Sequence, residues 1–239
     1  MTMPFHLLVT RRDVSTRRYS PVGLLTCTAG TYEFSYLRTA VESPGFRPIL
    51  GFSAVDRRYR SERLFPVFAE RVMDPRRPDR PRWLSSLGLD GDPEVMEILA
   101  RSGGRREGDH LELLAVPRVE HDGRTRTSFL VHGVSHADSV ADIDRLVVGD
   151  RLDLVDDPDN PVNARALVVS SVDGSRLGWV PDPLVEFVRH VRSHGECEVR
   201  VLRVNPADLG PHQRLLVELT GLADPSSAPL VDLARDAVG

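Results

Sequence analysis

Short stretches of alternating apolar and polar residues fill the second half of the chain, and they limit its fold more than any other feature. The stretches that predict strands cover 129–135, 150–157, 164–171, 175–180, 196–204 and 214–221. A period of two, bounded by Gly, Pro, Asp or Asn, is typical of half-buried strands. One helix is predicted among them over 182–195, with Pro183 in its first turn and Gly195 at its end. Short strands around a single helix indicate a small β-barrel or a curled sheet.

The first half predicts a mixture of strands and helices. Strands are expected over 4–10, 47–53 and 110–120, and a hairpin over 22–37 that turns at Ala29-Gly30. Helices are expected over 64–72, 82–89 and 92–104, the last with Asp92 before its first turn and Gly103 after its last. We therefore expect an α+β protein with a first domain over 1–120, a polar linker over 121–128, a second domain over 129–221 and a mobile tail over 222–239.

The 31 basic residues are all arginine, because the sequence contains no lysine. This excludes a lysine-containing phosphate loop, a Schiff-base lysine and ordinary protein-kinase chemistry. Residues 1–126 hold 21 arginines and 17 acidic residues, a net charge of +4, whereas residues 127–239 hold 10 arginines and 18 acidic residues, a net charge of −8. No apolar run approaches the ~20 residues that span a bilayer, and the N-terminal residues do not follow the order of a signal peptide. We expect a cytoplasmic protein without membrane association.

No set of side chains in the sequence indicates catalysis. Glu186, His190 and His194 share one helix face, but no third imidazole or thiolate lies near, so we interpret the stripe as solvated rather than as a metal site. The prolines in "DDPDNPVN" are incompatible with a calcium loop. Cys27 and Cys197 are interpreted as unpaired thiols in strands. We expect no enzyme activity, no metal and no cofactor.

The segment "DDPDNPVNARALVVSSVDGSRLGWVPD" (156–182) has two interpretations. A turn held by proline and by hydrogen bonds of Asn and Asp side chains explains it without a ligand. Alternatively, it forms the ligand-binding edge of the barrel, where amide groups donate and accept and a tryptophan stacks on a base or fills a pocket of a partner. The candidate ligand- or DNA-binding residues are Asn160, Asn163, Arg165, Trp179, Arg176, Arg145, Arg151 and His132.

Residues 129–221 contain an ordered series of turn motifs: Gly133, Gly149-Asp150, Asp157-Pro158, Asn160-Pro161 and Gly178-Trp179-Val180-Pro181. This series resembles the HIRAN domain. The resemblance implies a small OB-like β-barrel that, in eukaryotic fork-remodelling helicases, grips the 3′ end of single-stranded DNA. The family's end-binding aromatic and arginine residues are replaced here by "VADID" (140–144) and Val162-Asn163.

Residues 20–118 carry a second series: Val22-Gly23-Leu24, Phe34-x-Tyr36-Leu37, Phe65 with Phe68, Gly108-Asp109 and Pro117. It resembles the N-terminal subdomain of HipA-type serine/threonine kinases. In that family the subdomain packs on the kinase core, and in split systems a separate protein of this type binds and neutralises the kinase. No kinase core follows in this chain.

Two functions follow as hypotheses. The first is a non-enzymatic regulatory or adaptor protein of a toxin–antitoxin or phage-defence system, whose first domain binds a HipA-like kinase core and whose second domain binds another ligand or DNA. The second is a module that binds single-stranded 3′ ends within a repair or defence complex.

Overall fold

The computed structural model describes residues 5–106, 108–136, 138, 140–231, 233 and 237. The chain divides into two compact units. The first unit comprises residues 1–80, 92–116 and 230–239, and the second comprises residues 81–91 and 117–229. The chain thus crosses between the units several times.

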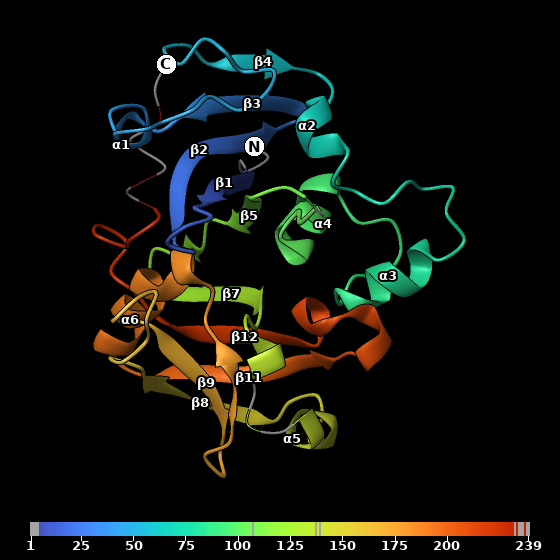
Figure 1. Cartoon of the computed structure of the whole chain (residues 1–239), viewed down its shortest axis with the longest axis vertical. Helices are drawn as coiled ribbons and strands as arrows, with labels where there is room; N and C mark the ends of the chain where they lie inside the picture. The colour runs from blue at the N-terminus through green and yellow to red at the C-terminus, as the bar shows by residue number, and fades with distance from the viewer. Residues whose placement is uncertain are drawn as a thin grey trace. The chain divides into compact units, whose positions relative to one another are not determined.

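The first unit contains a five-stranded antiparallel sheet with the order β4-β3-β2-β1-β5 (Figure 1). Its strands are β1 (Phe5–Arg12), β2 (Tyr19–Thr28), β3 (Thr31–Tyr36), β4 (Tyr59–Ser61) and β5 (Leu111–Ala115). The predicted hairpin is confirmed, because β2 and β3 pair around Ala29 and Gly30. Both turn residues have positive φ, 48° and 81°, as a two-residue turn of this kind requires.

Short helices of the first unit contribute to a core on the sheet. They are α1 (Arg38–Val41), α2 (Pro66–Ala69) and α4 (Val95–Ser102). Phe68 of α2 and Leu99 of α4 are buried in one cluster with Leu25 and Phe34 of the sheet. The helix predicted over 64–72 is therefore confirmed only at its centre. The helix predicted over 92–104 begins later, since Glu94 still has an extended backbone with ψ 141°.

The strand predicted over 47–53 is wrong. This segment belongs to an irregular loop, which the hydroxyl of Tyr36 holds in place. That hydroxyl donates to the carbonyl oxygen of Phe52 (2.8 Å) and accepts from the backbone N–H of Ile49 (2.7 Å). Ile49 and Phe52 are buried, whereas Leu50 between them is 90% exposed. The apolar residues of the loop therefore fill the core without joining a strand ladder.

The second unit contains a seven-stranded antiparallel sheet with the order β10-β9-β8-β11-β12-β7-β6. Its strands are β6 (Arg118–Val119), β7 (Arg124–Leu130), β8 (Arg151–Asp156), β9 (Leu167–Ser171), β10 (Arg176–Trp179), β11 (Cys197–Val204) and β12 (Leu215–Leu222). β7 occupies most of the segment expected to be a linker. Its burial alternates, with Thr125 and Thr127 inside, because β-branched threonine suits a strand although it is polar.

A backbone bridge joins the two ends of this curled sheet. The N–H of His132, just beyond β7, donates to the carbonyl of Trp179 in β10 (2.9 Å), and the N–H of Trp179 donates to the carbonyl of His132 (2.8 Å). Gly178 makes the approach possible, since a Cβ at this position would lie 2.4 Å from the carbonyl oxygen of His132. The α+β class and the curled antiparallel sheet predicted from the sequence are confirmed.

The helical part of the second unit differs from the single helix expected. The predicted helix is present as the 3-10 turn η2 (Asp182–Leu184) followed by α6 (Val185–Ser193), and its buried residues include Phe187 and Val191. The unit also holds most of α3 (Arg80–Ser86), α5 (Val140–Arg145) and the 3-10 turns η1 (Val134–His136), η3 (Ala207–Leu209) and η4 (Pro211–Gln213). Part of the tail predicted over 222–239 lies outside the described residues.

Candidate functional site

The segment 156–182 is held together by its own polar side chains. The Oδ1 of Asn160 accepts from the backbone N–H groups of Val162 (3.0 Å) and Asn163 (3.2 Å), and its Nδ2 donates to Asp157 (3.0 Å). The Oδ1 of Asn163 accepts from the backbone N–H of Arg165 (2.9 Å), and its Nδ2 donates to the carboxylate of Asp182 (2.6 Å). The amide groups that we expected at a ligand-binding edge therefore shape the turn itself.

Trp179 also makes its contacts within the unit. Its Nε1 donates to the Asp157 carboxylate (2.8 Å). Its ring lies against Gly133, where a Cβ would approach the ring to 2.7 Å, and the guanidinium of Arg176 lies 5.3 Å from the ring centroid. Because the backbone of Trp179 bridges His132, the structure places three of the predicted site residues side by side. Stacking on a base would require the ring to leave these neighbours.

Three of the four predicted cations of the second unit are paired with acidic residues. Arg165 forms a two-pronged ion pair with Glu186 (2.5 and 2.8 Å), and Arg176 pairs with Asp138 (2.8 Å). Arg145 pairs with Asp142 three residues earlier in α5 (3.0 Å). Arg151 is exposed at the start of β8. Within the described part of the chain, no hydrogen bond or ion pair joins the side chain of Arg145 or Arg151 to the 156–182 segment, so the structure does not join all eight candidates in one site.

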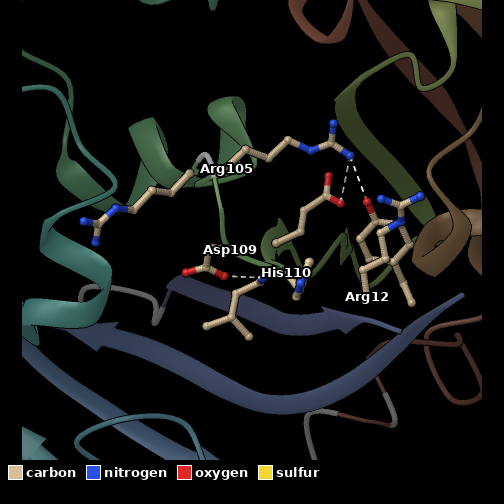
Figure 2. Close-up of a pocket in the computed structure, with 8 residues that line it drawn as sticks. Arg12, Arg105, Asp109 and His110 are labelled. Carbon is tan, nitrogen blue, oxygen red and sulfur yellow. Dashed lines mark hydrogen bonds and ion pairs between the residues drawn. The ribbon is translucent and has the colours of Figure 1, made fainter. Parts of the chain in front are cut away.

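A different group of polar residues lines a pocket of about 220 Å³ in the first unit (Figure 2). The lining residues are Arg12, Tyr19, Arg105, Arg106, Asp109, His110, Leu111 and Glu112. They come from the end of β1, the start of β2, the segment before β5 and β5 itself. β1 and β5 are neighbours, with Arg11 opposite Leu111. Sequence analysis missed this pocket, because its two halves lie about 90 residues apart and meet only through that pairing.

Arg105 is held on one side of the pocket by two acceptors. Its Nη2 donates to the Tyr19 hydroxyl (2.9 Å) and to Oε2 of Glu112 (3.3 Å), as the dashed lines in Figure 2 show. The Glu112 side chain is 4% exposed, whereas that of Arg105 is 34% exposed. Burial and the charge of Glu112 raise the pKa of Tyr19 to about 12. The Tyr19 phenol therefore stays protonated. The buried carboxylate of Glu112 stays paired with Arg105.

A second arginine, Arg71, forms an ion pair with the other carboxylate of the pocket, that of Asp109. The Arg71 side chain, which is 1% exposed, forms an ion pair with Oδ2 of Asp109 and donates to the carbonyl oxygens of Val67 (2.8 Å) and Gly104 (2.9 Å). Oδ1 of Asp109 accepts from the backbone N–H of Leu111 (2.6 Å). Both oxygens of Asp109 are thus engaged by the protein.

The other basic residues that line the pocket, Arg12, Arg106 and His110, are exposed. Arg106 forms an ion pair with Glu70, and both side chains are more than half exposed. The backbone N–H of Arg12 donates to the carbonyl of His110 (2.8 Å), which fixes these residues next to each other. Within the described residues, neither the Arg12 guanidinium nor the His110 imidazole has a hydrogen-bond or ion-pair partner.

The loop that follows Arg12 carries two further arginines. In "RRDVSTRR" (11–18) one oxygen of Asp13 accepts from the backbone N–H and the hydroxyl of both Ser15 and Thr16, at 2.6–3.0 Å. These hydrogen bonds lower the pKa of Asp13 to about 2. Arg17 and Arg18 are exposed at the end of this loop. The pair of arginine doublets around an Asp-x-Ser-Thr turn is the one sequence signal that could have indicated this surface.

The chemistry available here is binding of an anion. Arginine presents a planar fork of donors that matches the oxygens of phosphate and carboxylate groups. Among the residues that the structure describes, no group of three or more His, Cys, Asp or Glu side chains could hold a metal ion. No helix within the same residues is long and apolar enough to cross a bilayer.

Comparisons with known proteins give distant likenesses. No family model matches the chain, and no curated protein matches it. The HIRAN domain of human HLTF is 17% identical over 48% of this chain and 85% of that chain, with a TM-score of 0.33. A protein from Lactobacillus plantarum is 19% identical over 43% of this chain and 100% of that chain, with a TM-score of 0.32. At such low TM-scores, neither likeness determines what this chain binds.

Proposed function

We propose that this chain is a non-catalytic module that binds single-stranded nucleic acid, and that the arginines of the first unit contact the phosphates. The observation that carries the proposal is the difference in arginine pairing between the two units. Phosphate contacts supply most of the affinity of a protein for nucleic acid without sequence preference. The proposal keeps the ligand that the HIRAN resemblance implies but moves the main contact away from the HIRAN-like segment.

The second unit is poorly suited to a polyanion. Its residues 81–91 and 117–229 hold 13 arginines and 19 acidic residues, a net charge of −6. At least ten of these arginines form ion pairs with acidic side chains. A phosphate would have to displace a carboxylate at each of them and would meet the remaining negative charge.

The first unit offers arginines that can meet a phosphate without losing a partner. It holds 18 arginines and 16 acidic residues, and within its described residues six arginines form ion pairs. Arg12, Arg17 and Arg18 lie on a hairpin whose only carboxylate, Asp13, is occupied by Ser15 and Thr16. A loop already fixed by hydrogen bonds loses little conformational entropy when it binds.

The test is a fluorescence anisotropy titration of a labelled oligothymidine strand at several salt concentrations. If Arg12, Arg17 and Arg18 each neutralise one phosphate, affinity falls about 18-fold between about 50 and 200 mM salt, since the logarithmic slope is about −0.7 for each phosphate of a single strand. The affinity of the double variant Arg17→Gln/Arg18→Gln should fall only about threefold over the same range.

A matched control removes two exposed arginines of the second unit instead. The double variant Arg145→Gln/Arg200→Gln changes the net charge by the same amount, but both arginines already pair with acidic neighbours. It should retain the affinity and the salt slope of the unaltered protein. Absence of binding, or binding that does not depend on salt, would refute the proposed function.

The adaptor hypothesis, with a HipA-like kinase core as partner, has no observation of its own in the described residues. Its most direct test is co-purification with a kinase encoded beside this chain, and it stays a prediction.

A further inference from the structure

We propose that the pocket between the β1–β2 hairpin and β5 takes the terminal phosphate monoester of the bound strand. This inference rests on the proposed function, and it assigns to the pocket a role that the exposed loop arginines do not have. Those arginines contact phosphates along the strand, whereas the pocket would recognise where the strand ends.

The pocket presents cations whose positions are fixed before any ligand arrives. Tyr19 and Glu112 hold the guanidinium of Arg105 (Figure 2), and Glu70 pairs with Arg106. An arginine that is already oriented gives up less side-chain entropy when it binds an oxyanion. Arg105 and Arg106 are therefore positive charges that are oriented before a ligand binds.

Arg12 and His110 supply donors that the described residues leave without a partner. Arg12 ends β1 and His110 lies just before β5, and the hydrogen bond between their backbones keeps them adjacent. A guanidinium can donate two parallel hydrogen bonds to one phosphate, and an imidazole can donate a third. Together with Arg105, they surround a position for a tetrahedral anion from more than one side.

The carboxylates of the pocket do not prevent this use. Both oxygens of Asp109 are engaged, by Arg71 and by the backbone N–H of Leu111. Glu112 is almost completely buried and pairs with Arg105. Among the described residues, and with Arg71 and Glu70 included, the charged groups at the pocket are four arginines and three acidic residues, a net positive set.

The size and the floor of the pocket favour a strand end. A volume of about 220 Å³ is smaller than pockets that enclose a drug-sized ligand, so it suits one phosphate rather than a whole nucleotide. Leu111 and Glu112 of β5, which are 8% and 3% exposed, are buried residues of its lining. An internal phosphodiester continues in both directions, whereas a terminal phosphate continues in one and offers three unesterified oxygens to the arginines.

The test compares one oligothymidine sequence with a 5′-phosphate, with a 3′-phosphate and with hydroxyls at both ends, by competition against a labelled strand. One phosphorylated end should bind about tenfold more tightly than the hydroxyl-ended strand, as expected for one added set of charged hydrogen bonds. Arg12→Gln should reduce this preference to about twofold or less, and His110→Gln should reduce it in part. Both side chains are exposed, so folding should survive, and circular dichroism can verify it.

Arg18→Gln is the matched control on the same hairpin. It should weaken all three strands by the same factor and leave their ratio unchanged. Millimolar inorganic phosphate should abolish the preference for the phosphorylated end while leaving hydroxyl-ended binding nearly intact.

Equal affinity for all three strands would overturn this inference and leave the proposed function standing. A preference that survives in both Arg12→Gln and His110→Gln would also overturn it, because the end would then be recognised elsewhere. If thymidine monophosphate binds more tightly than the phosphorylated strand, the pocket serves free nucleotides and the inference is wrong. No binding of any strand would refute the proposed function together with the inference.

Discussion

Replacing Gly178 by alanine is expected to open the bridge that closes the sheet of the second unit. The added Cβ would lie 2.4 Å from the carbonyl oxygen of His132 and 2.6 Å from Cγ1 of Val131. The first of these neighbours is backbone, so it cannot rotate away as a side-chain end could. Gly178 also has φ +150°, a conformation that residues with a Cβ rarely adopt.

The expected loss of stability follows from the hydrogen bonds that the added Cβ breaks and from the strain of the backbone. Separating Gly178 from His132 breaks the two backbone hydrogen bonds between His132 and Trp179, each of which contributes about 0.5–1.5 kcal/mol. The backbone conformation adds about 1–3 kcal/mol of strain. The free energy of unfolding of the second unit should therefore fall by about 3 kcal/mol or more.

Gly174 provides a matched control in the turn before β10. It also has a positive φ, +87°, but no atom lies within 4 Å of where its Cβ would stand. Gly174→Ala should cost only about 1–2 kcal/mol, the usual penalty for a left-handed backbone. The difference between the two variants isolates the steric contribution at the bridge.

Urea unfolding followed by tryptophan fluorescence measures this difference directly. The two tryptophans, Trp83 and Trp179, both belong to the second unit, so the signal reports that unit. Gly178→Ala should unfold at a urea concentration about 1 M or more below that of Gly174→Ala, with similar slopes. Equal urea midpoints for the two variants would show that the bridge accommodates the added Cβ without loss of stability, and would refute the reasoning.

Three further predictions concern the first unit, and circular dichroism during urea unfolding can measure each. Tyr36→Phe leaves two buried backbone groups of the loop over 42–58 without a partner, so unfolding should become about 2–3 kcal/mol easier. Asp109→Ala leaves the buried charge of Arg71 without its partner and should lower the free energy of unfolding by about 2–3 kcal/mol. This is less than the loss of a fully buried ion pair, because the Asp109 side chain is 26% exposed. Asp109→Asn should cost less, since its amide oxygen can still accept a hydrogen bond. The pKa of Asp13 is lowered from 3.8 to about 2, so its contribution is present above about pH 4 and is lost as pH falls towards 2; Asp13→Asn should remove that part of the pH dependence.

The strands and the main hairpin could be predicted because their signal is local. The alternating burial at the start of β8 and the Ala29-Gly30 turn depend on residues that are neighbours in sequence. The conformation of the loop over 47–53 could not be predicted, because it depends on hydrogen bonds between its backbone and the hydroxyl of Tyr36, which lies earlier in the sequence. β7 overlaps the segment expected to be a linker. That expectation depends on polarity, whereas threonine, although polar, suits a strand.

The site was harder to predict than the fold because residue type does not reveal partners. Asn160, Asn163 and Trp179 have the chemistry of a ligand-binding edge, yet Asp157 and Asp182 take their hydrogen bonds. The acidic excess of this half is visible in the sequence, but it does not tell which arginine pairs with which carboxylate. The pocket of the first unit depends on the pairing of β1 with β5, which no local pattern reports.

The features that carry the HIRAN resemblance have a structural explanation in this chain. Gly133 and Gly178 allow the backbone and the ring of Trp179 to approach, and Asp157 accepts from both Trp179 and Asn160. A fold that must close a short curled sheet needs these residues whether or not it holds a ligand. Stability and affinity should therefore separate in this protein: changes at the closure lower the unfolding free energy of the second unit, whereas changes at the exposed arginines of the β1–β2 hairpin lower affinity for phosphate and leave the fold intact.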